Sequence, residues 1–435
     1  MQYASALPTS ARVSARTSIQ LLLLTLTSAA AFYARTALSP LQETIRIALS
    51  LSDNQMALLQ GPALALPLVL GAVPLGLLID RYSRVRLLLL LASLDVLGSL
   101  LTAWASHFLI LFVARALIGL AATTTCTAAF SLLADLCPAE QRGRANMMVL
   151  IGQFAGLAAA FALGGVLAVN TGGTPTGWRW ALLWMTLPLI PLALLIFAMR
   201  EPARTGVAIE NPSPREAFAE LWRYRNIIAP LLLGLVTTEI ASGAVLVWAA
   251  PSLSRGFGLS ADRIGAILSS VVLVSGVLGC VAGGILADAC HRTGGPTRTA
   301  TALSVLALLN LLADLFPIAP SPAWASVLLF LFMTIVGALL VTGIALFTIV
   351  IPNELRGLCL SAMTGINTLF AVAFAPLTVS LLSGTLGGPA MIGRALTLVC
   401  VAASLLGGVT FAWGRRSIAS APLLQATLTA GQGIP

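Results

Sequence analysis

Charge is what this sequence lacks most. Only 9% of its 435 residues are Asp, Glu, Lys or Arg, whereas a soluble chain carries about 25%. Hydrophobic residues make up 58% of the chain, and its mean hydropathy is +0.97. A water-exposed surface of ordinary size cannot be built from this composition, which excludes a soluble enzyme, a nucleic-acid-binding domain and a disordered chain. The composition predicts an integral membrane protein made of helices.

Lysine is absent, and histidine and cysteine are sparse. All 24 basic residues are arginines, and they are scattered through short loops rather than clustered, so we expect no nucleic-acid partner. The two histidines lie far apart in the sequence, and the six cysteines show no CxxC spacing. We interpret the cysteines as reduced packing residues and expect no metal site, no cofactor and no catalytic residues. The missing GxxxxGK[ST] loop argues against transport driven by ATP.

Long apolar runs divide the chain into twelve expected membrane helices. A span needs about 20 apolar residues, so the chain is long enough for twelve. The expected spans are 18–46, 54–79, 86–105, 107–136, 144–169, 178–199, 227–254, 260–288, 298–317, 323–352, 358–384 and 391–414. The polar segment 200–226 separates an N-terminal bundle, 18–199, from a C-terminal bundle, 227–414, with tails at 1–17 and 415–435. The predicted fold is therefore an all-α membrane protein with two six-helix bundles.

The arginines also predict the orientation. Seventeen lie in the N-tail and in every second loop. Five lie in the opposite loops, namely Arg46, Arg179, Arg255, Arg263 and Arg394. Because arginine is enriched on the cytoplasmic side of membranes, this bias places both termini in the cytoplasm of a bacterial-type inner membrane.

Two short motifs each occur twice, which supports a chain made of two similar halves; each repeat is called an echo below. Gly76-Leu-Leu-Ile-Asp80 is repeated as Gly284-Ile-Leu-Ala-Asp288, and Pro138-Ala-Glu-Gln-Arg-Gly143 as Pro352-Asn-Glu-Leu-Arg-Gly357. Each echo falls in the matching loop of the other half. Parallel halves of six helices are a known plan of transporters.

Specific motifs extend this expectation to a family. Gly76-x-x-x-Asp80-Arg81-x-x-Arg84 resembles the loop after the second span of the major facilitator superfamily, and Leu111-x-x-x-Arg115-x-x-x-Gly119 resembles its fourth-span motif. Tyr33-Ala34-Arg35 and Trp248-x-x-Pro251 resemble spinster-type lipid transporters, although sugar-phosphate and organic-anion carriers share some of these features. Spinster-type members commonly carry carboxylates at the positions of Ala34 and Ala122, so their coupling mechanism does not transfer directly.

Ionisable groups inside the spans are the candidate functional residues, because each is costly at membrane depth. We expect Arg35 to bind an anionic head group through its planar guanidinium, or else to form a structural ion pair. The resemblance implies that Arg115 lines the cavity, with a bond to backbone carbonyls as the alternative. Glu239 is the best remaining proton carrier, or the ion-pair partner of Arg35. Asp95 is expected to be a helix-packing or water-bonded acid, with proton coupling as the alternative, and Asp314 is expected to be solvated.

Polar residues in apolar spans are the other candidate substrate contacts, each with an interhelical hydrogen bond as its alternative role. They include Tyr33, Thr124, Gln153, Trp248 and Asn367. Loop charges form a candidate gate that closes the cytoplasmic side in one state, or they serve topology alone. The gate residues are Asp80, Arg84, Glu140 and Arg142, with Asp288, Glu354 and Arg356 in the second half. Gly156, Gly164 and Gly165 are expected to allow close helix approach.

These observations predict a secondary transporter of an anionic or amphipathic small molecule that works by alternating access. Protons are the expected coupling ion, the lipid bilayer is the environment, and a monomer is the expected state. The lipid-like substrate rests on the resemblance alone, and a sugar phosphate, organic acid or drug is the alternative. A transporter-like sensor or an uncoupled lipid scramblase is the other functional class that remains open.

Overall fold

The computed structural model describes residues 15–420, apart from 138, 172–175, 203–221, 223, 352–358, 360 and 361. Throughout the described ranges the secondary structure is helical. The tails beyond residues 15 and 420 and most of the central segment 200–226 lie outside the described residues, so the structure does not bear on them.

Among the described residues, the N-terminal bundle is built from eleven helical elements before residue 200. They are α1 (Ala15–Thr36), η1 (Ser39–Leu41), α2 (Gln42–Ala48), α3 (Asp53–Gln60), α4 (Pro62–Arg81), α5 (Arg84–Trp104), α6 (Phe108–Leu136), α7 (Ala139–Thr171), α8 (Gly177–Thr186) and α9 (Leu189–Leu195), followed by η2 (Ile196–Ala198). The second expected span is broken at Gly61, so that α3 and α4 are separate helices.

The C-terminal bundle follows the central segment. Its elements are α11 (Arg225–Phe257), α12 (Ala261–Ala313), η3 (Phe316–Ile318), α13 (Pro322–Val350), η4 (Thr368–Phe374), α15 (Ala375–Thr385), η5 (Pro389–Met391) and α16 (Ile392–Ala419). Element η4 is a π-helix. The spans expected at 260–288 and 298–317 run on as α12, which turns at Gly295, where φ is +63° and Pro296 follows.

Local sequence signals explain several of these boundaries. Ser52 and Gln55 form a capping box that starts α3, and Ser321 accepts a hydrogen bond from the Trp324 N–H at the start of α13. Gly258 ends α11 in the left-handed conformation, with φ at +64°, which glycine adopts without steric cost.

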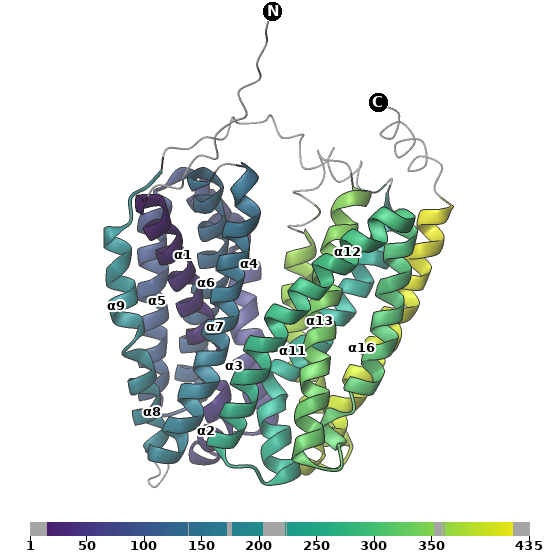
Figure 1. Ribbon diagram of the computed structural model, residues 1–435. Coiled ribbons are helices and arrows are strands. Elements are labelled where there is room, and N and C mark those ends of the chain that lie inside the picture. Colours follow the sequence, from purple (N-terminus) through teal and green to yellow (C-terminus); the bar gives the residue numbers. More distant parts are fainter. Residues whose placement is uncertain are drawn as a thin grey trace, which may run out of the picture.

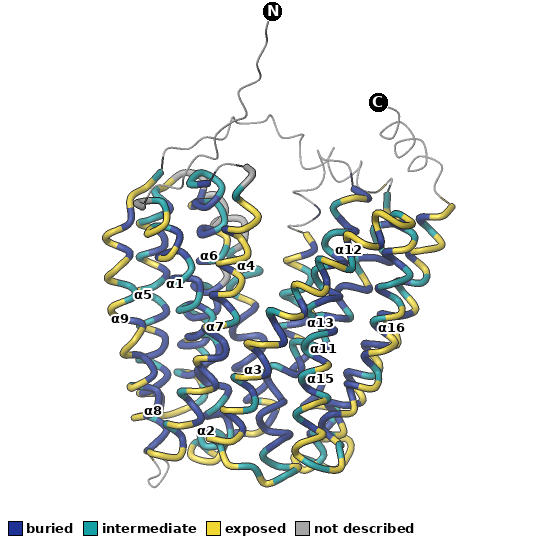
Figure 2. The backbone as a smooth tube through the Cα atoms, in the orientation of Figure 1, coloured by how far each residue is buried: buried dark blue, intermediate teal, exposed yellow. Residues whose placement is uncertain are grey.

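Ten helices in the described ranges are long and apolar enough to cross a membrane. One of them, residues 261–318, contains the turn at Gly295 and therefore two expected spans, and α4 is a further apolar helix of 20 residues. Large apolar side chains such as Leu70, Ile285 and Val409 are 65–80% exposed, as suits outward faces that meet lipid. Figure 2 shows such exposed stretches along the outer helices of both bundles.

The two bundles meet at one end and diverge at the other (Figure 1). We call the end at which α1 begins and α16 ends the terminal end, and the other the opposite end. Near the opposite end, α7 of one bundle packs against α12 of the other at Gly165, where an added Cβ would lie 2.6 Å from the Ala261 carbonyl oxygen. The glycine at 165 therefore permits the close approach that the sequence predicted.

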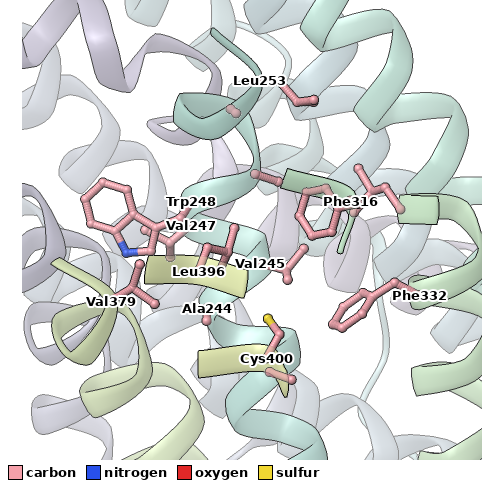
Figure 3. Packing of buried hydrophobic residues seen from close by; sticks show 14 of the residues in the cluster. Ala244, Val245, Val247, Trp248, Leu253, Phe316, Phe332, Val379, Leu396 and Cys400 are labelled. Carbon is pink, nitrogen blue, oxygen red and sulfur yellow. The ribbon is translucent and has the colours of Figure 1, made fainter. Parts of the chain in front are cut away.

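The largest buried apolar cluster lies mainly in the C-terminal bundle and extends across the interface. Trp248, Phe316 and Phe332 are fully buried in it (Figure 3), and Phe161 of α7 joins it from the N-terminal bundle. Shared burial of this kind holds the two bundles together around the residues described next.

Candidate functional site

A cavity of about 170 Å³ lies between the bundles. The N-terminal bundle provides most of its wall from α1, α4, α6 and α7, and the π-helix η4 provides the rest. The lining residues are Phe32, Arg35, Leu64, Ala65, Leu68, Gly119, Cys126, Phe130, Gln153, Thr368 and Val372. The wall is thus mostly apolar, with one charged group and a few polar ones, as in many small-molecule sites.

Arg35 supplies the charge in this cavity. It lies in the last turn of α1, with its guanidinium 5.8 Å from the centre of the Phe32 ring, which holds it by a cation–π contact. Within the described part of the chain, its guanidinium has no hydrogen bond and no ion pair closer than 4 Å. Glu239 on α11 lies across the interface, close enough to interact with Arg35 electrostatically. The structure therefore brings together the two residues that the sequence singled out for substrate and proton.

Arg115 binds backbone carbonyl oxygens and does not line this central cavity. Its Nη2 donates to the Arg35 carbonyl oxygen at 2.6 Å, and its Nε donates to the Leu59 carbonyl oxygen at 3.4 Å. Both carbonyls belong to the last turn of a helix, α1 or α3, where carbonyl groups lack helical partners. Arg115 thus caps two helix ends, which is the alternative role that the sequence left open.

The other candidate contacts are distributed differently. Gln153 lines the cavity, and Asn367 directly precedes the lining residue Thr368. Thr124 is buried and donates to the Leu120 carbonyl oxygen of its own helix. Trp248 is fully buried, and its indole N–H donates to the Pro376 carbonyl oxygen at 2.9 Å, which places it in the core and away from the cavity.

Two further acids lie inside the membrane helices. Asp95 on α5 is 4% exposed, inside the N-terminal bundle. Asp314 was expected to be solvated, and that prediction was wrong, because the residue is fully buried. Its Oδ1 accepts from Asn310 Nδ2 at 3.0 Å, and the same Nδ2 donates to Ser404 Oγ at 3.1 Å. The α12 helix end is covered by α16, a neighbour that sequence position does not reveal.

Cys126 also differs from its expected role. All six cysteines are free, and four are buried, as packing residues should be. Cys126 is half-buried and lines the cavity, where Gln153 Nε2 lies 3.4 Å from its sulfur. A native thiol is therefore available beside Arg35.

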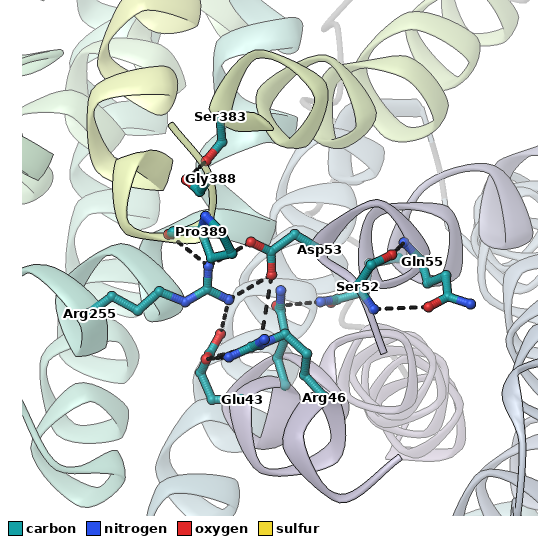
Figure 4. Close-up of polar contacts among 11 residues, drawn as sticks. Glu43, Arg46, Ser52, Asp53, Gln55, Arg255, Ser383, Gly388 and Pro389 are labelled. Carbon is teal, nitrogen blue, oxygen red and sulfur yellow. Dashed lines mark hydrogen bonds and ion pairs between the residues drawn. The ribbon is translucent and has the colours of Figure 1, made fainter. Parts of the chain in front are cut away.

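A cluster of four charged residues joins the two bundles at the opposite end, and the sequence analysis missed it (Figure 4). Arg255 of α11 donates to both carboxylate oxygens of Asp53, at 2.7 and 2.8 Å, and to Glu43 at 2.6 Å. Arg46 lies 3.3 Å from Glu43 and 3.7 Å from Asp53. We call these four residues the Arg255 cluster. The bidentate pairing is the strong form of the arginine–carboxylate contact.

The helix dipole explains why the acids and the arginine of this cluster lie at particular helix ends. Asp53 and Glu43 lie in the first turns of α3 and α2, and Arg255 lies in the last turn of α11. Acids are favoured at helix N-termini and bases at C-termini by the helix dipole. Arg46 and Arg255 were counted in the sequence only for topology, and the acids at the same end were the signal that would have revealed the cluster.

A second arginine, Arg84, holds two acids near the terminal end. Its Nη1 lies 2.5 Å from Asp135 Oδ2, and its Nε lies 2.9 Å from Glu201 Oε1. Arg84 and Asp135 belong to the N-terminal bundle, and Glu201 lies just after its last element, η2. Glu201 also accepts from Ser83 and from the Val85 N–H; partial burial opposes ionisation, but these hydrogen bonds outweigh it and lower the pKa of Glu201.

The remaining gate candidates are only partly described. Arg142 is exposed and donates to the Cys137 carbonyl oxygen, and Asp288 is exposed. The side chains of Asp80 and Glu140 lie outside the described residues, as do Glu354 and Arg356 altogether. Among the ion pairs of the described residues, the two at the terminal end do not involve the C-terminal bundle, whereas the Arg255 cluster crosses between bundles.

Two helical bundles that enclose a charged cavity between them have the architecture of a membrane transporter. The family model of the Major Facilitator Superfamily matches residues 24–376. The chain belongs to the Major Facilitator Superfamily, which confirms the family and the fold expected from the sequence.

Curated relatives include Protein spinster homolog 1 of Xenopus tropicalis, 28% identical over 255 residues, which is 54% of this chain and 47% of the relative. The D-xylose transporter of Levilactobacillus brevis is 30% identical over 132 residues, 30% of this chain and 28% of the relative. The matched stretch thus spans less than half of either relative.

Solved structures show the same fold over nearly the whole chain. A bacterial homolog of the human lysosomal transporter Spinster, inward-facing and unoccupied, superposes with a TM-score of 0.80 and 20% identity, covering 94% of this chain and 99% of that one. A D-xylose–proton symporter superposes with a TM-score of 0.67 and 17% identity, covering 89% and 96%. The spinster-type likeness predicted from the sequence is thereby confirmed.

Proposed function

We propose that this protein is a secondary transporter that moves a small anionic or amphipathic molecule by alternating access, coupled to protons. The observation that carries the proposal is Arg35, a guanidinium in the cavity between the bundles that is free of hydrogen bonds to the described residues. An arginine so placed is costly unless water or a ligand meets it, and it can bind a phosphate or carboxylate bidentately.

The cavity suits the head group of such a molecule. Its volume of about 170 Å³ is below the range of about 300–1,000 Å³ that is typical of sites for drug-sized ligands. Apolar side chains such as Phe32, Leu68 and Phe130 surround the charge. We therefore propose that the anionic group contacts Arg35 and Gln153, with Asn367 at the edge and Arg115 as the residue that positions Arg35.

Orientation and gating complete the proposal. The arginine bias supports a cytoplasmic terminal end in a bacterial-type inner membrane. In that orientation the Arg255 cluster closes the outer side, and the bundles diverge toward the cytoplasm. The gate at the cytoplasmic side would then form in the other state, from Asp80, Glu140, Arg142 and their second-half counterparts. Such an inward-open arrangement agrees with the structure of the bacterial spinster homolog, which is inward-facing.

Ligand binding can be tested on the purified protein by thermal stabilisation. The probes are glucose 6-phosphate, succinate and lysophosphatidylglycerol, with D-xylose as the uncharged comparison. A hydrogen bond to a charged group contributes about 1.5–3 kcal/mol, so Arg35→Gln should weaken binding of the stabilising anion about 10- to 100-fold. Arg394→Gln, an exposed residue in the first turn of α16, is the control. Equal stabilisation of wild type and Arg35→Gln would refute the role of Arg35 as the head-group contact.

Proton coupling is tested separately, through Glu239. In proteoliposomes, a pH gradient should drive accumulation of the anion identified above in wild type but not in Glu239→Gln. Exchange of labelled for unlabelled anion should survive this substitution, because exchange needs no net proton movement. Unchanged pH-driven uptake in Glu239→Gln would exclude this carboxyl as the carrier. Binding without accumulation in wild type would identify a sensor or an uncoupled scramblase instead.

A further inference from the structure

Two small polar cavities lie inside the N-terminal bundle, apart from the central cavity. The first is lined by Thr27, Asp95 and Thr125 together with apolar residues of α9 and η2, and its volume is about 10 Å³. The second has the same volume, and Tyr33, Ser99, Thr102, Arg115 and Thr186 provide its polar lining. Leu189 lines both cavities, and Asp95 and Ser99 are one turn apart on α5, so the two are neighbours.

Buried polar atoms without partners line both spaces. In the part of the chain that the structure describes, Asp95 Oδ1, Thr125 Oγ1 and Tyr33 Oη have no hydrogen bond. These side chains are at most 7% exposed. Buried polar groups are nearly always hydrogen-bonded, because each unpaired one costs about 1–3 kcal/mol. Three such atoms around two small spaces indicate a ligand that supplies their hydrogen bonds.

The size of the spaces identifies that ligand as water. A cavity of about 10–15 Å³ by this measure holds one water molecule, which needs two to four polar partners. Thr27, Thr102 and Thr186 donate to carbonyl oxygens of their own helices, which leaves their hydroxyl oxygens able to accept a bond from water. Each space therefore offers the donors and acceptors that one water requires.

Asp95 is the acid of this hydrated region. The titratable groups that interact with it electrostatically are Arg115 and Cys126, both on α6. Tyr33 on α1 belongs to the adjoining space, and α9 and η2, which pack on α5, contribute no titratable side chain. Among the described residues, Arg115 is thus the positive charge that interacts with Asp95, and it also donates to the Arg35 carbonyl oxygen.

We infer that Asp95, with one water in each cavity, forms a proton-binding site inside the N-terminal bundle, linked through Arg115 to the helix that carries Arg35. A hydronium ion that transfers its proton to the Asp95 carboxylate becomes a neutral water, and it leaves a neutral acid whose O–H donates to the cavity water. The charge opposite Arg115 is then lost. The inference extends the proposed function, since coupling would involve Asp95 as well as Glu239, but the site exists independently of transport.

Infrared difference spectroscopy of the purified protein, acidic minus alkaline and without substrate, tests this site. The wild type should show a carboxylic C=O band that is lost in Asp95→Asn and retained in Glu239→Gln. In Thr125→Val, which keeps the carboxyl but removes a cavity hydroxyl, the band should shift in frequency. This variant also carries the test if Asp95→Asn does not fold.

Three infrared results would overturn the proposed proton-binding site. A spectrum unchanged by Asp95→Asn, or unshifted in Thr125→Val, would overturn the inference. A difference produced by exchanging choline for sodium at constant pH, and lost in Asp95→Asn, would show a sodium site and would also overturn it. Because no substrate is present, these failures leave the transport assays of Arg35 and Glu239 unaffected, and failure of those assays does not alter the infrared result.

Discussion

The two ends of the molecule use the same contact for different purposes. At each end one arginine holds two carboxylates: Arg84 binds Asp135 and Glu201, and Arg255 binds Asp53 and Glu43. The Arg84 side chain is 4% exposed, and its partners lie in its own bundle or directly after it, whereas Arg255 is 13% exposed and its partners lie in the other bundle. The location of a contact relative to the bundle interface, more than its chemistry, decides whether it stabilises a fold or a conformational state.

Removal of Arg84 should have the largest effect on folding. Arg84→Ala removes the guanidinium that binds Asp135 and Glu201, and breaking a buried ion pair costs about 3–5 kcal/mol. The free energy of unfolding of the purified protein should fall by about this amount. Arg86→Ala, an exposed neighbour on the same helix, serves as the control. If both variants unfold alike, Arg84 is not a structural anchor.

Removal of Arg255 should instead change the balance between states. Loss of its charge-assisted bonds should disfavour the closed opposite end by about 1.5–3 kcal/mol, or about 10- to 100-fold in population, with a smaller loss of unfolding free energy than Arg84→Ala. Pulsed electron–electron resonance between spin labels at Ile47 and Leu386 measures this, with exposed Arg263→Ala as the control. A distance distribution identical to wild type would contradict the role of the cluster as a lock.

The contact of Gly165 with the other bundle allows the closed opposite end to be weakened without a change in charge. Gly165→Ala places a Cβ 2.9 Å from the Gly265 Cα in the other bundle, and overpacking typically costs about 1–3 kcal/mol. The same spin-label pair should report a wider opposite end. Gly284→Ala is the matched control, because a Cβ there meets nothing within 4 Å. Equal distances in the two variants would show that the interface accommodates the added methyl group and that the opposite end stays closed.

Acid should produce the smallest effect, at the terminal end. The lowered folded-state pKa of Glu201 means that its ionised form stabilises the fold above the unfolded pKa of about 4.3, and that this contribution is lost as pH falls through the folded value. Because Glu201 is only partly buried, solvent screens the effect. The difference in thermal stability between wild type and Glu201→Gln should therefore be constant well above about pH 4.3 and should shrink as the pH falls below it. A constant difference at all pH values would contradict this.

Sequence reasoning found the residues that stand alone and missed those that depend on neighbours. Arg35 and Glu239 are isolated charges in apolar spans, a pattern visible in the sequence, and the structure brings both to the bundle interface. The Arg255 cluster joins residues about 200 positions apart, so only the packed bundles reveal it. The burial of Asp314 and the core position of Trp248 likewise depend on α16 and α15, which local sequence does not predict.

The central claim is that Arg35 faces solute in a cavity between the bundles, and the native thiol of Cys126 tests it most directly. In a variant with the other five cysteines replaced, an anionic methanethiosulfonate should modify Cys126 at least about tenfold faster than a cationic one of similar size, because the nearby guanidinium attracts the anion. Arg35→Gln should abolish or reverse this preference. Equal rates for both reagents in the presence of Arg35, or no modification by either, would contradict the account.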